Sequence, residues 1–173
     1  GVTMPGASYN LDINLGNYAS IKRAEKIFGT LSKEIDSALD DALEETAQEM
    51  EKKALESLSS YGLGGSEVAS SVKLDNTGNG ISLVASSDHA DYVEFGTGIR
   101  GAESPHPNPD GWSYDVNEHG DAGWVYKGKD GKFHWTAGTR SRPFMYETWI
   151  YGSRIVGSKV NKHINSLLKG VGL

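Results

Sequence analysis

The sequence has no cysteine and no long run of apolar residues. Without cysteine it forms neither disulfides nor thiolate metal sites, a composition that fits a protein made in a reducing cytoplasm. No apolar stretch approaches the roughly 20 residues that a membrane-spanning helix needs. The first residues also lack the charged and then apolar pattern of a signal peptide. These absences predict an ordinary soluble protein.

Positive charge is scarce as well. The chain has 17 Lys and Arg against 23 Asp and Glu, a net charge of −6, which argues against non-specific nucleic-acid binding as the main task. Residues 1–98 carry 16 acidic and 7 basic side chains, a net −9, whereas residues 99–173 carry 7 and 10, a net +3. We expect the two halves to attract each other, either by docking the last helix on the long helix or through contacts between copies.

The length suits one domain, residues 1–173, which would bury roughly two thirds of its unfolded surface. Residues 1–16 are predicted to be a flexible start and a strand, because apolar and polar residues alternate from Tyr9 to Leu15. The order of the elements that follow predicts a single α+β domain.

Helical spacing of apolar residues dominates the next part of the chain. It predicts a short helix over 18–28 that ends or bends at Gly29, and a long helix over 31–59 with Gly62 as its stop signal. The acidic side chains of the long helix are expected to form a solvated face or a docking surface for a basic neighbour; they are Glu34, Asp40, Asp41, Glu44, Glu45 and Glu51.

Two hairpins and a final helix complete the predicted α+β fold, in which the long helix and the C-terminal helix pack on an antiparallel sheet. Alternation over 68–74 and 81–85 predicts the first hairpin, with its apolar face on the long helix. Residues 99–122 hold no periodic pattern and are predicted to be a long surface loop. Pro143 suits the first turn of the last helix. The predicted buried stripe of that helix is Met145, Trp149, Val156, Val160, Ile164 and Leu167.

Residues 123–137 are rich in aromatic side chains and are predicted to form an inserted hairpin. A two-residue Asp130-Gly131 turn would pair Tyr126 with Trp135. The aromatic residues would then share one face, as Trp124, Tyr126, Phe133 and Trp135. That face either covers the core of the chain or forms part of an interface with another subunit.

The stretch from Tyr92 to Gly98 is the centre around which the sequence is organised. Tyr92, Val93 and Phe95 need apolar neighbours, whereas Gly96 and Gly98 permit the positive φ values that other residues adopt at a cost. We therefore expect the chain to pack here and then turn sharply.

Residues 96–101 match the dinucleotide-binding pattern G-x-G-x-x-G. The context does not suit it, because no βαβ unit surrounds the pattern and residues 102–105 are not expected to start a helix. No cofactor is predicted. A hydrolase that acts at this glycine-rich loop is the enzymatic alternative.

Other catalytic and metal-binding patterns are missing. The candidate metal ligands lack a recognised spacing; they are His89 and Asp91, or Glu118, His119 and Asp121. Neither a nucleophile elbow nor a His-Glu-x-x-His motif occurs, and none of the 23 carboxylates is singled out as half of a glycosidase pair. The prediction is a protein that is not an enzyme and has no metal site or catalytic residues.

Two short motifs carry a family resemblance. Residues 89–97, with the core Tyr-Val-Glu-Phe-Gly-Thr, precede residues 140–145, with a Pro-Phe-Met element that opens the last helix. Together they resemble the neck and tail-completion proteins of long-tailed bacteriophages, the group related to tail protein Z of lambda. The resemblance extends from about Leu31 to the last helix. About 40 residues separate the motifs, more than compact members have, and the first 16 residues match nothing familiar.

The resemblance implies a structural virion protein of the phage neck or tail, assembled in the host cytoplasm. It would form a ring with itself, expected to be a hexamer, and contact the tail terminator or the head-tail connector, without binding membrane or specific nucleic-acid sequences. A monomeric binding module that uses the aromatic hairpin is the alternative. The matching positions are Tyr92, Val93, Glu94, Phe95, Gly96, Thr97, Arg142, Pro143, Phe144 and Met145.

These positions have different expected roles. The four with large apolar side chains are expected in the core of the chain; they are Tyr92, Phe95, Phe144 and Met145. Glu94 and Thr97 are expected to touch a neighbouring subunit or to cap the last helix. On the first of these interpretations, Glu94→Lys would leave the subunit folded and weaken assembly.

Overall fold

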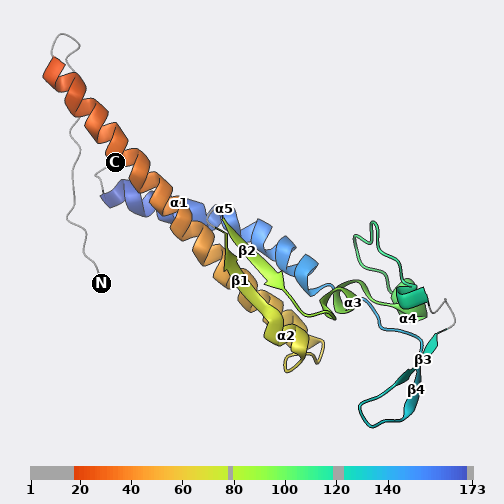
Figure 1. The fold of residues 1–173 in the computed structure, drawn as a ribbon. Helices are drawn as coiled ribbons and strands as arrows, with labels where there is room; N and C mark the ends of the chain where they lie inside the picture. Colours follow the sequence, from red (N-terminus) through yellow and green to blue (C-terminus); the bar gives the residue numbers. More distant parts are fainter. Residues whose placement is uncertain (1–17, 78–79, 119–122, 171–173) are drawn as a thin grey trace. The chain divides into compact units, whose positions relative to one another are not determined.

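A computed structural model describes residues 18–77, 80–118 and 123–170 (Figure 1). The fold is α+β, as predicted, with two long helices and two antiparallel hairpins. The predicted strand over 9–15 lies outside the described residues. In chain order the elements are α1 (Tyr18–Ser60), α2 (Glu67–Ser71), β1 (Val72–Asn76), β2 (Ile81–Ala85), α3 (Ala90–Phe95), α4 (Gly98–Glu103), the 3-10 turn η1 (Val116–Glu118), β3 (Trp124–Lys127), β4 (Phe133–Thr136) and α5 (Phe144–Gly170).

Contacts divide the chain into two compact units. The helical unit consists of residues up to 48 and from 152 onward, and the mixed unit consists of residues 49–151. The prediction of a single domain stays a prediction. None of the helices described is long and apolar enough to cross a membrane.

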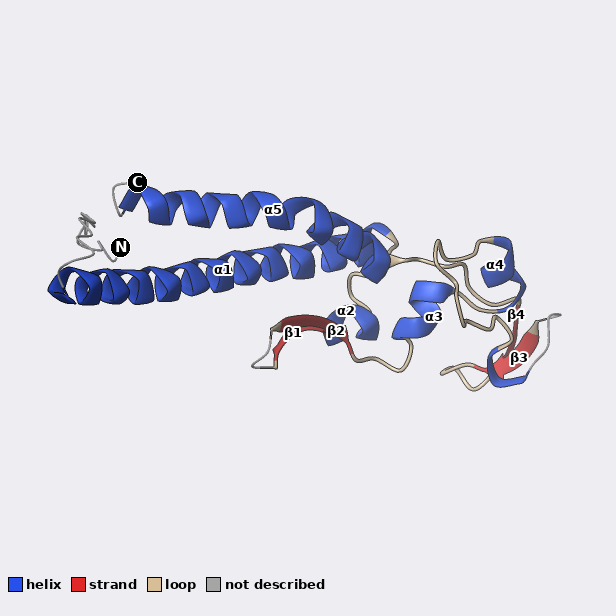
Figure 2. Cartoon of the chain, turned by 90° about the horizontal axis from the view of Figure 1, so that it is seen from above, coloured by secondary structure: helices blue, strands red, loops and turns tan. Residues whose placement is uncertain are grey.

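In the helical unit, α1 and α5 run alongside each other (Figure 2). Ala38 and Ala42 are buried on α1. Glu45 of α1 accepts hydrogen bonds from Lys159 and Lys162 Nζ at 2.9 Å each, and lies 2.8 Å from His163 Nε2. The expected attraction between the acidic long helix and the basic last helix is therefore confirmed, and Glu45 does not belong to a solvated face.

The cluster around Glu45 predicts a pH-dependent stability. Hydrogen bonds from Lys159, His163 and Lys162 lower the pKa of Glu45 from 4.5 to about 2. The carboxylate is therefore protonated in the unfolded chain before it is protonated in the folded chain, so its stabilising effect is complete above pH 4.5 and is lost as the pH falls to about 2. Between pH 4.5 and about 2, we expect the urea midpoint of unfolding to decrease less in Glu45→Gln than in the wild type. A Glu56→Gln control, on an exposed side chain of the same helix, should leave the decrease unchanged, and equal slopes in wild type and Glu45→Gln would contradict the prediction.

The predicted helix end at Gly29 is wrong, because α1 continues through it. A glycine in a helix costs only about 1 kcal/mol relative to alanine, which the rest of a 43-residue helix offsets. The stop at Gly62 is confirmed. Gly62 has a φ of 75°, and the N–H of Leu63 donates to the carbonyl of Leu58 at 2.8 Å, the pattern of a Schellman cap.

The core of the mixed unit forms where the end of α1 meets α2, the first hairpin, α3 and the first turn of α5. Phe144 and Leu58 are fully buried in it, and Leu83 and Ala85 of β2 pack against it. The predicted packing of the hairpin on the long helix is confirmed. The buried residues of this core are Ala54, Leu58, Val68, Ala69, Val72, Ala90 and Phe144.

The first hairpin is shorter than predicted. β1 begins only at Val72 and pairs with β2 from Val72↔Ala85 to Asn76↔Ile81, whereas residues 67–71 form α2. Ser66 causes the difference, because its side-chain oxygen accepts the N–H of Ala69 at 3.2 Å and so caps a helical turn.

The predicted long surface loop over 99–122 is wrong for its first part. Residues 99–103 belong to α4, and His106 is buried with 5% of its surface exposed. The turn at η1 also lies within this range. Helix formation is possible because α4 starts at Gly98, before the segment that was expected to prevent it.

The buried stripe of α5 differs from the predicted one at its first turns. The helix begins directly after Pro143, as expected, and Phe144 and Thr148 are fully buried. Trp149 is 60% exposed, so its predicted burial is wrong. On α1, Leu43 is similarly exposed, whereas the smaller Ala42 is buried.

Candidate functional site

The two resembling motifs meet at the start of α5, and Glu94 is the residue that joins them. Its Oε2 accepts the N–H of Met145 at 2.9 Å, and its Oε1 accepts the N–H of Tyr146 at 2.9 Å. Oε1 also lies 3.0 Å from Nε2 of His106. The side chain of Glu94 is 9% exposed and that of His106 is 4% exposed.

This arrangement satisfies the amide groups that a helix leaves without partners at its first turn, and it places a carboxylate where the helix dipole is positive. Glu94 therefore caps the last helix, one of the two roles expected for it. Because the side chain is buried, the expectation that Glu94→Lys leaves the subunit folded no longer holds: a lysine at 94 would face the same N–H groups with another donor.

The backbone around Glu94 is joined to the second motif as well. The N–H of Arg142 donates to the carbonyl of Val93 at 2.8 Å, and Ser141 Oγ donates to the carbonyl of Glu94 at 2.6 Å. Thr97 and Thr139 exchange two backbone hydrogen bonds of 2.9 and 3.0 Å. Thr97, which is buried, thus pairs within its own chain.

The glycines of the G-x-G-x-x-G pattern are explained by close packing of backbone. A Cβ on Gly96 would lie 2.6 Å from the nitrogen of Ser141, and one on Gly98 would lie 2.7 Å from the carbonyl oxygen of Ala137. Gly96 and Gly98 have φ values of 81° and 61°, so the expected sharp turn is confirmed. A Cβ on Gly101 would lie 2.7 Å from the ring of Tyr114. The pattern therefore serves the fold of the mixed unit.

Aromatic rings surround the turn. Phe95 stacks on Trp112 with ring centroids 4.9 Å apart, and His106 lies 4.6 Å from Phe95. Trp112 Nε1 donates to the carbonyl of Gly96 at 2.9 Å. Trp112 and His106 complete the site but were not predicted from the sequence. Their one sequence signal is that they are large side chains inside a stretch otherwise rich in Gly, Pro, Asn and Asp.

The second hairpin forms, but the predicted register is wrong by one residue. Val125 pairs with Trp135 and Tyr126 pairs with His134. The N–H of Gly131 donates to the carbonyl of Gly128 at 2.9 Å, and Gly131 has a φ of 75°. This is a three-residue loop with a glycine bulge rather than a two-residue turn.

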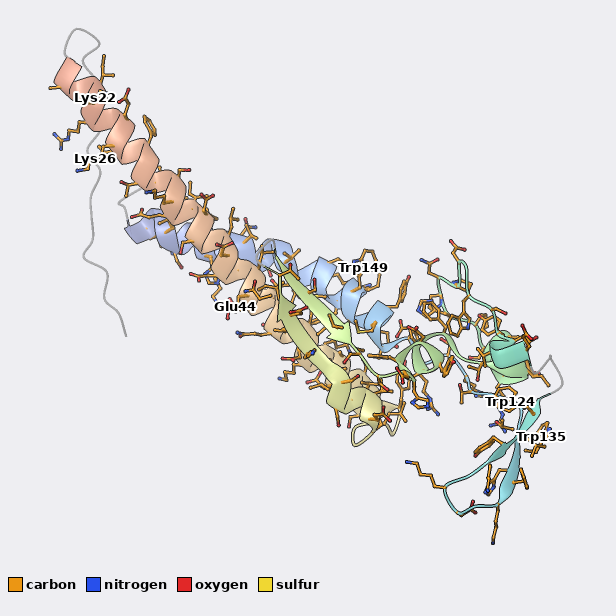
Figure 3. All side chains as sticks on the ribbon, viewed as in Figure 1. Lys22, Lys26, Glu44, Trp124, Trp135 and Trp149 are labelled. Atoms are coloured by element: carbon orange, nitrogen blue, oxygen red, sulfur yellow. The ribbon has the colours of Figure 1, made fainter. Side chains whose placement is uncertain are left out.

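The change of register separates the aromatic residues onto two faces, because paired strands alternate in side-chain direction. Val125, Phe133 and Trp135 share one face and are 58, 77 and 62% exposed. Trp124 and Tyr126 share the other face. Figure 3 labels Trp124 and Trp135 on the two strands. None of the described hairpin residues belongs to the buried core of the mixed unit, so the predicted role of covering the core is not supported.

Two hollows are lined in part by residues 138–142, the segment that joins the hairpin to α5. The first, of about 490 Å³, is lined by Tyr61, Gly138, Thr139, Ser141 and three arginines, Arg100, Arg140 and Arg142. The second, of about 400 Å³, shares Arg140 and Arg142 and adds aromatic side chains, among them Tyr92, Trp124 and Tyr126. Partial burial and a hydrogen bond to Glu147 raise the pKa of Tyr61 to about 12, so its hydroxyl stays neutral.

The described residues contain no group of three or more His, Asp and Glu side chains that could hold a metal ion. His89 and Asp91 are exposed, and the Glu118, His119 and Asp121 set lies partly outside the described residues. What the site offers is aromatic and arginine side chains on a backbone held by hydrogen bonds. Such a surface suits recognition of another molecule. No family model, curated protein or solved structure matches the chain.

Proposed function

We propose that this chain is a structural subunit of a phage neck or tail. Copies of it would form a ring at the head-proximal end of the tail and join the tail to the tail terminator or the head-side connector. The function comes from the resemblance of residues 89–97 and 140–145 to the neck and tail-completion proteins. The hydrogen bonds that Glu94 accepts from the first turn of α5 support treating these two segments as one motif.

The observation that carries the proposal of an assembling subunit is the exposed aromatic hairpin. Three large apolar side chains, Val125, Phe133 and Trp135, lie on one face of it with more than half of their surface in solvent. Exposed apolar groups gathered in this way mark interaction sites, and Trp, Tyr and Arg dominate the energetics of interfaces. We therefore expect another subunit to cover the hairpin and the arginine-lined hollow beside it.

The same hairpin also suits the alternative, a monomeric binding module. The two functions differ in one measurable property, because only the ring requires self-association. The hydrolase alternative has less support, since Gly96 and Gly98 of its loop pack closely against the backbone of residues 137–141.

A double substitution in the hairpin tests the proposal. Phe133→Ser with Trp135→Ser should leave the thermal unfolding midpoint nearly unchanged, because both side chains are mostly exposed and surface changes alter stability by about 0.5 kcal/mol or less. The same variant should no longer assemble into the ring of subunits. Light scattering after size exclusion, over a range of protein concentrations, and negative-stain microscopy measure this.

Trp149→Ser is the matched control. Trp149 is 60% exposed, like Trp135, but lies on α5 outside the hairpin, so this variant should still assemble. A wild-type protein that is monomeric at every concentration would contradict the ring and favour the binding module. Ring formation by the double variant would show that the hairpin is not the contact.

A further inference from the structure

The arginine-lined hollow of the mixed unit brings three positive charges together from two places in the chain. Arg100 comes from α4, and Arg140 and Arg142 come from the segment before α5. Among the described residues that line it there is no carboxylate. Tyr61, which lines the hollow, donates a hydrogen bond to Glu147, and Glu147 accepts a second one from Ser57.

Within the described ranges, no ion pair involves any of the three arginines. Arginine remains charged at all relevant pH values and presents a planar fork that binds a carboxylate through two hydrogen bonds. The hollow therefore has the chemistry of a binding site for an anion.

The backbone of this site is fixed before any ligand arrives. The segment from 138 to 142 is held by the paired Thr97 and Thr139, by the hydrogen bond from Arg142 N–H to Val93 and by the contact of Ser141 Oγ with Glu94. A preorganised backbone reduces the entropy lost on binding.

The chain itself carries a matching acidic surface. Asp36, Asp40 and Glu44 recur at every fourth position of α1 and are exposed, and Asp41 lies beside them. Figure 3 labels Glu44 on this helix. Like charges four residues apart destabilise a helix, and no basic side chain in the described part of the chain pairs with Asp36, Asp40 or Asp41. This acidic stripe, Asp36, Asp40, Asp41 and Glu44, is therefore stabilised by any cationic partner.

We propose that the hollow lined by Arg100, Arg140 and Arg142 binds the acidic stripe of α1 from a second copy of this chain. The inference rests on the proposed function and specifies the contact by which the copies would join. A phosphate backbone is the less suitable anion, because the net charge of −6 repels a polyanion. Since the hollow and the stripe are different patches, the contact is head-to-tail, and repetition of it closes a ring or extends a filament.

Charge reversal on both sides tests the inference. Arg140→Glu alone, and Asp40→Lys with Asp41→Lys, should each weaken self-association by about tenfold or more. A mixture of the two variants should associate as tightly as the wild type. In the mixture the reversed hollow meets the reversed stripe, and the unchanged hollow meets the unchanged stripe. Sedimentation velocity at low and high salt measures all three samples, and high salt should weaken the association of the wild type.

Lys73→Glu is the control, because Lys73 is exposed on β1, outside the aromatic hairpin, and does not line the hollow. It should change association by less than about twofold. If the contact between the hollow and the stripe does not depend on protein concentration, it lies within one chain, and the inference is overturned. Wild-type association in Arg140→Glu overturns it as well, as do two weakened variants that fail to rescue each other; in both cases the proposed subunit function stands.

Two further outcomes separate the inference from the function on which it rests. A wild-type protein that does not self-associate under any condition contradicts the proposed function as well. If a labelled DNA duplex binds the wild type and Arg140→Glu removes that binding while self-association is unchanged, the anion is a phosphate and the inference is overturned.

Discussion

Glu94→Ala is expected to lower the free energy of unfolding by about 3 to 5 kcal/mol, because each buried polar group that loses its hydrogen-bond partner costs about 1 to 3 kcal/mol. The substitution leaves the N–H groups of Met145 and Tyr146 without their acceptor. It also leaves His106 buried without the carboxylate that it contacts. Urea denaturation followed by circular dichroism measures the change.

Two further variants separate the causes. Glu94→Gln keeps the size of the side chain, but its single amide oxygen cannot accept from all three donors, so we expect a loss smaller than that of alanine. Glu103→Ala removes an exposed carboxylate nine residues away and should change stability by about 0.5 kcal/mol or less. Equal effects of Glu94→Ala and Glu103→Ala would show that the cap contributes nothing.

Gly138→Ala should also lower the stability of the protein strongly, because position 138 has neither the space nor the backbone conformation for a Cβ atom. Gly138 is buried with a φ of 89°, and a Cβ there would overlap the carbonyl oxygen of Thr97. The left-handed conformation costs a non-glycine residue about 1 to 2 kcal/mol, and forcing extra atoms into a packed region costs about 1 to 3 kcal/mol more. We expect a loss of about 2 to 5 kcal/mol in the free energy of unfolding, measured by thermal unfolding.

Gly111→Ala is the matched control for this prediction. Gly111 has a φ of 78°, and no atom lies within 4 Å of the position of its Cβ. Only the backbone cost applies there, about 1 to 2 kcal/mol. If the two alanine variants unfold at the same temperature, the close approach of residues 97 and 138 does not stabilise the protein.

Features encoded by local pattern were predictable from the sequence. The glycine stop of α1, the turn at Gly96, the start of α5 after Pro143 and the existence of both hairpins all follow from residue types with strong local preferences. The attraction between the acidic and basic halves was also predictable, and Glu45 with its three partners on α5 is its outcome.

The predictions from sequence were wrong where the structure depends on contacts with distant residues, or where one sequence suits two local structures of similar energy. An Asp-Gly pair suits either a two-residue turn or a three-residue loop with a glycine bulge. Here Asp130 Oδ1 accepts the N–H of Lys132 at 3.0 Å and also lies 3.0 Å from His134 Nε2, contacts that accompany the longer loop. The sequence pattern does not contain these geometric details.

Partners of the candidate site were harder still to predict. His106 contacts Glu94 across 12 positions, and Met145 contacts it across 51. Periodicity cannot detect such pairs, because it reports only which face of one element is apolar. For the same reason the stripe of α5 was misplaced: Trp149 looked buried from its hydrophobicity, whereas the smaller Thr148 occupies the interior.

The one-residue shift in the second hairpin affects how a partner can bury its aromatic side chains. A hairpin with aromatic side chains on one face can bury all of them against a flat partner surface, while its other face stays in solvent. This hairpin presents Trp135 and Phe133 on one side and Tyr126 on the other, so contact with a flat surface leaves aromatic area in water. Burial of all its aromatic side chains therefore requires contacts on both faces of the hairpin, and the Tyr126 face already lines the second hollow of its own chain.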